Sequence, residues 1–183
     1  MKARIVRFEV IGAILAIVAG TLLHFTFQWL GGWRPAALMS AVNESTWEHL
    51  KLAFWPMFIL ALIQYYAYKR NGVFSRTDKG AFCVGKAVGM YLAPLLIIAA
   101  FYGYKALLGK DVLILDILIF IIAVVIGQYT AYRIFMHADP GRLAVIIATL
   151  AIIVELAAFS LFTFYPPHAF LFRDPITGGY GIQ

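Results

Sequence analysis

Two stretches of the sequence gather side chains that could bind a ligand or exchange protons. They are residues 42–51 (VNESTWEHLK) and residues 165–181 (YPPHAFLFRDPITGGYG). Carboxylate and imidazole groups bind cations and metal ions, and they transfer protons near neutral pH. The ligand-binding candidates within these stretches are Asn43, Glu44, Glu48, His49, His168 and Asp174.

Two further candidates, Glu155 and His24, stand alone in long apolar segments. Glu155 lies within the run Ala151–Ala158, which has no other polar residue. A charged side chain at the centre of a membrane span costs about 2.5–3.5 kcal/mol on insertion scales. We therefore expect Glu155 to face other helices, either protonated or paired with a cation or metal; a structural hydrogen bond is the simpler alternative. The same reasoning applies to His24, although a neutral imidazole is cheaper to bury.

The order Ser45-Thr46-Trp47-Glu48 is typical of a capping box at the start of a helix. In this motif the Ser45 hydroxyl accepts from the Glu48 amide and the Glu48 carboxylate accepts from the Ser45 amide, so Glu48 needs no further role. An ion pair between Glu48 and Lys51 is also expected. His49 lies about 100° further round the helix and is expected to point elsewhere.

Imidazole and carboxylate ligands from several helices could also hold a divalent metal ion. The candidate ligands are His24, His49, His168 and Glu155, with Glu48 as general base for a metal-activated water. The chain has no His-Glu-x-x-His spacing and no paired Glu-x-x-His, so spacing does not single out a metal site. It also lacks a nucleophile elbow, a phosphate-binding glycine loop and a Rossmann fingerprint, so no organic cofactor is expected.

Composition decides which elements must position these residues. The chain has 183 residues, of which 63% are hydrophobic and 13% charged. A soluble domain has about 45–50% apolar and about 25% charged residues, so we predict an integral membrane protein with a single domain, residues 1–183. The net charge of +6 comes from basic residues between the apolar segments, which is typical of topology signals and not of nucleic-acid binding. The single cysteine, Cys83, excludes an internal disulfide.

The apolar segments predict an all-α bundle of five transmembrane helices. They cover about residues 5–29, 46–68, 80–104, 112–133 and 142–165, and residues 166–183 form a tail. Lys and Arg residues in the connections predict a cytoplasmic N-terminus and an extracytoplasmic C-terminus. The cytoplasmic side would hold Lys2, Arg4, Arg7, Lys69, Arg70, Arg76, Lys79, Arg133 and Arg142, and the other side Arg34, Lys105, Lys110 and Arg173.

Small residues at helical spacing predict where these helices touch. One stripe is formed by residues 12, 16 and 20 of the first span, and another by residues 85, 89 and 93 of the third. Lys86 and Gln128, in the cytoplasmic halves of their spans, are expected to cap helices or to reach the membrane surface.

The tail is expected to fold back over the outer mouth of the bundle as a lid. Pro166-Pro167 ends the fifth helix, and Phe170–Phe172 is too apolar to remain in water. Residues 174–179 have the composition of turns. Such a lid would hold His168 and Asp174 near residues 43–51.

In the two polar stretches the chain resembles an uncharacterised family of small multi-spanning bacterial membrane proteins, known as a domain of unknown function. The similarity covers nearly the whole chain in length and spacing. It rests on residues 42–51, on His24 and Trp29, and on the pattern Pro166-Pro167-His168…Phe172-Arg173-Asp174-Pro175…Thr177-Gly178…Tyr180-Gly181. The resemblance implies a multi-pass protein of the bacterial inner membrane, and it implies no activity.

Three functions remain open, and the sequence does not decide whether the protein is an enzyme. The first is binding or passage of a small polar or cationic ligand, or of a lipid headgroup. The pocket would face outward between the first, second and fifth spans, with Glu155 as charge partner and Glu48 and His49 at its mouth. The second is a metal-dependent hydrolase acting on lipid or peptide at the outer interface, and the third is an accessory subunit without a ligand. Membrane lipids are expected partners in each case, and the oligomeric state is left open.

Overall fold

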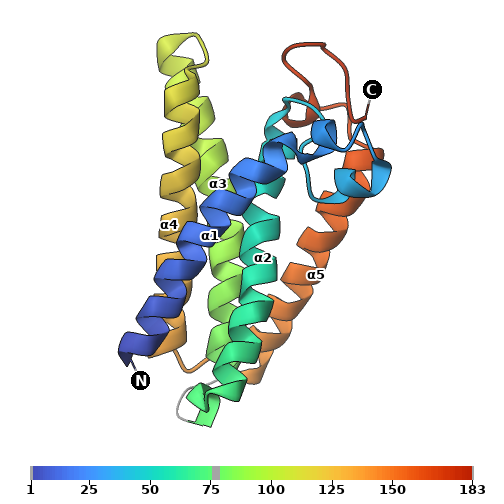
Figure 1. The fold of residues 1–183 in the computed structure, drawn as a ribbon. Coiled ribbons are helices and arrows are strands. Elements are labelled where there is room, and N and C mark those ends of the chain that lie inside the picture. Colours follow the sequence, from blue (N-terminus) through green and yellow to red (C-terminus); the bar gives the residue numbers. More distant parts are fainter. Residues whose placement is uncertain (1, 76–78, 183) are drawn as a thin grey trace.

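The computed structural model describes residues 2–75 and 79–182 (Figure 1). This part of the chain is all-helical, and each of the five long helices is long and apolar enough to cross a membrane. The prediction of five long apolar helices is therefore confirmed. The helices are α1 (Lys2–Trp29), α2 (Thr46–Arg70), α3 (Lys79–Leu108), α4 (Leu113–His137) and α5 (Arg142–Phe164), with short 3-10 helices η1 (Arg34–Leu38), η2 (Val73–Ser75) and η3 (Phe170–Phe172).

Helix α2 is the centre of the bundle, and every residue from Leu50 to Met57 is buried. Helices α1 and α3 pack against α2, α4 forms an extensive contact with α3, and α5 packs on α3. The N-terminus lies at one end of the bundle (Figure 1). The end of α1, the start of α2 and the residues after α5 lie at the opposite end, which we call the tail end (Figure 1).

The outward faces of α1, α4 and α5 are apolar and exposed. Ile14 on α1 is 56% exposed, Ile122 on α4 is 54% exposed and Ile147 on α5 is 58% exposed. Several charged residues, by contrast, are buried between the helices, among them Glu9 and Lys86. Exposed apolar faces together with charged residues turned inward are expected of a helix bundle in lipid.

Small residues lie at the helix contacts. Gly89 on α3 and Gly127 on α4 face each other so closely that a Cβ on Gly89 would lie 2.6 Å from the Gly127 carbonyl oxygen. On α1, the predicted stripe of Gly12, Ala16 and Gly20 is buried. These positions let the backbones approach closely, which is how helices associate in a bilayer.

A buried polar cluster joins four helices at the end that holds the N-terminus. Glu9 of α1 lies 2.7 Å from the Lys86 ammonium of α3 and accepts hydrogen bonds from Tyr68 of α2 (3.0 Å) and from Gln128 of α4. We call these four residues the Glu9 cluster. The prediction that Lys86 and Gln128 cap helices or reach the surface is wrong, because both side chains turn inward to the Glu9 carboxylate.

The tail folds back onto the tail end of the bundle, as predicted. The Asn43 amide donates to the Gly181 carbonyl at 2.8 Å and so ties the end of the tail to the start of α2. Phe172 is buried, and its ring centroid lies 4.7 Å from that of Trp47. Phe170 remains 73% exposed. The apolar run of the tail therefore anchors through Phe172 rather than through all three side chains.

Candidate metal centre

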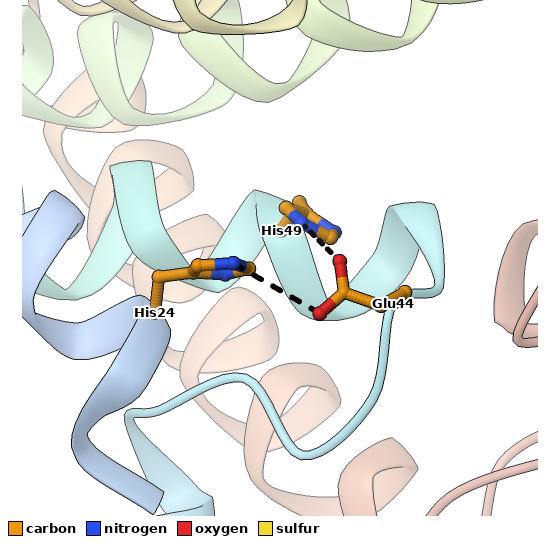
Figure 2. Close-up of side chains that lie close together, drawn as sticks. All are labelled: His24, Glu44 and His49. Carbon is orange, nitrogen blue, oxygen red and sulfur yellow. Dashed lines mark ion pairs between the residues drawn. The ribbon is translucent and has the colours of Figure 1, made fainter. Parts of the chain in front are cut away.

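Three side chains with metal-binding atoms meet at the tail end of the bundle (Figure 2). His24 comes from the last turns of α1, Glu44 from the connection after it, and His49 from the first turn of α2. Glu44 Oε2 lies 3.4 Å from His49 Nε2, and Glu44 Oε1 lies 3.9 Å from His24 Nε2. One ligand atom from each residue lies within 4.8 Å of the other two. We call these residues the His–Glu–His group.

Hydrogen bonds on both sides of Glu44 hold it between the two histidines. The buried Ser40 hydroxyl accepts from the Phe27 amide at 2.8 Å and donates to the Leu23 carbonyl at 2.5 Å. Both partners belong to α1, so these bonds tie the connection to that helix. On the other side, the Asn43 side chain accepts from the Ser45 amide at 2.9 Å, forming a turn immediately before α2. The backbone that carries Glu44 is thus anchored to both helices that supply the histidines.

A backbone carbonyl fixes the orientation of His49. Its Nδ1 lies 2.9 Å from the Ser45 carbonyl oxygen. Because a carbonyl oxygen can only accept, Nδ1 carries a hydrogen and Nε2 is the nitrogen that faces Glu44. Metal-binding histidines commonly have this arrangement, in which a carbonyl or carboxylate holds one ring nitrogen and directs the other to the ion.

Two occupants can lie between His49 Nε2 and the Glu44 carboxylate. One is a proton, which makes His49 an imidazolium that donates to Glu44; this hydrogen bond lowers the pKa of the Glu44 carboxyl below its ordinary value of 4.5. The other is a metal cation bound by both atoms. Without either, the Nε2 lone pair would face a negative charge. The site therefore favours a positive occupant.

Two imidazoles and one carboxylate form a donor set suited to divalent transition metals, and three protein ligands leave coordination positions open. Ligand atoms around a tetrahedral zinc ion lie roughly 3.3–3.4 Å apart, given bonds of about 2.0–2.1 Å. The His49–Glu44 distance of 3.4 Å already fits, and the His24–Glu44 distance of 3.9 Å is slightly longer. The His24 and His49 side chains are 25% and 36% exposed, so an ion can reach the group from solution.

Glu48 lies in a separate, fully buried group. Its carboxylate is 2.6 Å from the Lys51 ammonium and accepts from the Val42 amide at 3.0 Å. Lys51 also donates to the Ala37 carbonyl at 2.8 Å and to the Thr163 hydroxyl at 2.7 Å. The predicted ion pair is confirmed. This arrangement favours a structural Glu48 over the general base of the hydrolase hypothesis.

The capping box is half formed. The Ser45 hydroxyl accepts from the Glu48 amide at 3.4 Å, as predicted. The Glu48 carboxylate does not return to the Ser45 amide, because it is held by Lys51 while Asn43 takes that amide.

The remaining tail and connection candidates stabilise the fold around the His–Glu–His group. Asn43 bridges the tail and the turn before α2, as described above. Asp174 is buried and accepts from the Ile176 amide at 2.9 Å and the Thr177 hydroxyl at 2.8 Å, which fixes the predicted turn. His168 stacks on Tyr180 with ring centroids 4.5 Å apart. The structure does not group His168 with His24 and His49.

Glu155 is buried on α5, as its apolar surroundings predict, but it is separate from the His–Glu–His group. It is 7% exposed, and its Oε2 has no hydrogen-bond partner among the described residues. One turn earlier on α5, the Ala151 carbonyl accepts from Tyr91 of α3 at 2.8 Å. We predicted a pocket that joins Glu155 to Glu48 and His49. The cavity at the tail end differs from this prediction, because Glu155 is not among the residues that line the cavity.

That cavity opens beside the His–Glu–His group and has a volume of about 390 Å³. Glu44 belongs both to its lining and to the His–Glu–His group. The rest of the wall combines aromatic rings with basic and hydroxyl side chains from α3, the start of α2 and the tail. The lining residues are Glu44, Thr46, Phe101, Tyr102, Lys105, Phe170, Arg173, Asp174, Pro175 and Gly178.

Sequence reasoning named Glu44 as a ligand-binding candidate but omitted it from the metal ligands. Glu44 lies in a non-helical part of the connection between α1 and α2, and helical spacing cannot predict where such a residue lies relative to the two histidines. Glu9 was missed altogether, although a signal existed. Residues 9, 12, 16 and 20 follow one helical stripe, so the small-residue face of α1 already placed Glu9 toward the bundle.

Comparison with known families gives one match over nearly the whole chain. The model of a family of unknown function (DUF6512) covers residues 2–182. No curated protein and no solved structure matches the chain. The resemblance expected from the sequence is confirmed as to family, and the family description gives no activity.

Proposed function

Since the chain belongs to this family of unknown function, we propose a function from its own geometry: it is a multi-pass membrane protein that binds a divalent transition-metal ion through His24, Glu44 and His49. The observation that carries the proposal is His49, whose Nδ1 is held by a backbone carbonyl while its Nε2 faces a carboxylate at 3.4 Å. In this proposal the ligand is a cation. The residues that hold it lie at the tail end of the bundle, and Glu155 is not one of them.

Membrane insertion is supported by the distribution of polarity. Five helices are long and apolar enough to span a bilayer, and the outward faces of three of them are apolar and exposed. Among the described residues near the helix ends, eight Lys and Arg residues lie toward the end that holds the N-terminus and four lie toward the tail end. By the positive-inside rule the tail end is extracytoplasmic and the protein lies in the cell membrane, with lipids as partners.

An extracytoplasmic position suits a metal site that fills from solution. Exposed Trp29 and Trp33 lie at the same end as the His–Glu–His group, and tryptophan favours the headgroup layer. The three ligands therefore lie near the membrane surface. A metal held by three protein ligands keeps positions for water or a further ligand, which is compatible with either metal-dependent chemistry or metal transfer.

The test is metal content after controlled loading. Protein purified in detergent is stripped with a chelator, loaded with Zn²⁺ or Co²⁺, passed over a desalting column and measured by elemental analysis. We expect about one ion per chain, and in the cobalt form the visible absorption bands of a low-coordinate site with nitrogen and oxygen ligands. His49→Gln and Glu44→Gln should lose both signals.

His168→Gln is the matched control, because His168 lies at the same end but outside the His–Glu–His group. It should load like the unmodified protein. The proposal is wrong if the unmodified protein retains no stoichiometric metal, or if His168→Gln and His49→Gln lose metal equally.

A further inference from the structure

We infer that the cavity beside the metal site binds the phosphate group of a membrane lipid, with Arg173 and the metal as its two positive partners. This inference rests on the proposed metal site and names the class of molecule that the open side of that site receives. Glu44 is common to the metal site and the cavity wall. A ligand in the cavity therefore lies next to a residue that binds the ion.

The charges around the cavity favour an anion once a metal is bound. The wall holds two acidic residues, Glu44 and Asp174, and two basic residues, Lys105 and Arg173. The four charges of the wall cancel, and a divalent ion that displaces the His49 proton adds one net positive charge beside them. An anion should therefore bind more strongly to the metal-loaded form.

Of the two basic residues in the wall, Arg173 is the one that is free to contact the phosphate. Lys105 is already paired with Asp111 at 2.8 Å and lies over the Phe101 ring. Asp174 keeps its carboxylate within the turn, so it does not neutralise Arg173 directly. Arg173 is exposed, and its Nε donates to Gly178 at 3.4 Å, which anchors one edge of the guanidinium. A guanidinium binds phosphate oxygens in a planar, two-pronged geometry.

The apolar part of the wall favours a lipid over a free anion. Phe101, Tyr102 and Phe170 line the cavity, and the Tyr102 and Phe170 rings meet edge to face at 5.3 Å. Phe170 is largely exposed. An aromatic wall beside basic residues at the headgroup layer matches a molecule that joins a phosphate to an apolar chain. Inorganic phosphate carries the same anionic chemistry without the chain, and it is therefore the comparison ligand.

The experiment measures binding of dioctanoyl phosphatidic acid, dioctanoylglycerol and inorganic phosphate to detergent-purified protein by calorimetry. Each titration is made with the zinc-loaded and the chelator-stripped protein. We expect the zinc-loaded protein to bind dioctanoyl phosphatidic acid at least about tenfold more tightly than the stripped protein. Dioctanoylglycerol should not bind. Weaker binding of inorganic phosphate supports a lipid, and equal binding of both overturns the assignment to a lipid.

Arg173→Gln should weaken dioctanoyl phosphatidic acid binding about tenfold while leaving the metal content unchanged. Arg34→Gln removes another exposed arginine of the tail end, outside the cavity wall, and should have no effect. Arg173→Lys keeps the charge and should recover part of the affinity, which separates a lost contact from a disturbed tail. The inference is overturned if binding is independent of metal or of Arg173 while metal loading is normal. Failure of metal loading itself would overturn the proposed function instead.

Discussion

The Glu9 cluster allows a quantitative test of what holds the helices together, through Lys86→Met. Methionine preserves much of the apolar stem of Lys86 and removes its charge. Glu9 is 5% exposed and would keep its hydrogen bonds from Tyr68 and Gln128 without a counter-ion. Removing one partner of a buried ion pair costs about 3–5 kcal/mol, because the other charge stays buried.

The expected loss is measurable as a shift in thermal unfolding of the detergent-solubilised protein, followed by circular dichroism. At about 2–4 °C per kcal/mol for a chain of this size, the midpoint should fall by roughly 6–20 °C. Lys69→Met makes the same chemical change on an exposed residue at the end of α2 and should shift the midpoint little.

A double variant decides whether the loss comes from the unpaired charge. Glu9→Gln with Lys86→Met removes both charges, and the new amide can still pair with Tyr68 and Gln128. This variant should be more stable than Lys86→Met alone. The reasoning would be refuted if Lys86→Met matched Lys69→Met, or if the double variant were no more stable than the single one.

Three other substitutions test individual residues of the bundle and its tail. Gly89→Ala should clearly lower the midpoint of thermal unfolding, because the new Cβ would lie 2.6 Å from a carbonyl oxygen of α4. Gly103→Ala, on the same helix, is the control. Its Cβ meets no atom within 4 Å, and alanine favours a helix over glycine, so the midpoint should rise slightly. In the metal-free protein the His49 hydrogen bond lowers the pKa of Glu44, so its contribution to stability is present above pH 4.5 and is lost as the pH falls through the lowered value. Unfolding midpoints of chelator-stripped protein measured from pH 6 to pH 3 should therefore fall less steeply for Glu44→Gln than for the unmodified protein. Asn43→Ala removes the hydrogen bonds to Gly181 and to the Ser45 amide, at a stability cost of about 1–3 kcal/mol, and should speed cleavage of the tail by protease. An unchanged cleavage rate would contradict the anchoring role of the bond to Gly181.

The helices could be predicted because apolar length is a property of each segment alone. The five predicted ranges each fall on one helix, and the main differences are extra turns at the ends. The third range was predicted to end near Tyr104, and α3 continues to Leu108. The capping role of Ser45 and the turn around Asp174 were equally local, and both are present.

The partners of polar residues could not be predicted in the same way. Lys86 and Gln128 each look like surface-directed residues on their own helices, and their common acceptor lies on α1, 77 residues before Lys86. His49 was expected to point away from the acidic residues of its helix. It does turn from Glu48, but it meets Glu44, whose position depends on the path of the connection. Local periodicity describes which face a residue occupies, and it cannot describe what another segment brings to that face.

The buried ion pairs Glu48–Lys51 and Glu9–Lys86 have different consequences for synthesis of the chain. Glu48 and Lys51 lie three residues apart, so they can enter the bilayer together as an already neutral pair. Glu9 is made long before Lys86, and translation at about 5–20 residues per second would separate them by roughly 4–15 s. In the proposed membrane arrangement, α1 must wait near the cytoplasmic surface, or beside the insertion machinery, until α3 arrives. In this arrangement the Glu9 cluster would make the final depth of the first helix depend on the third.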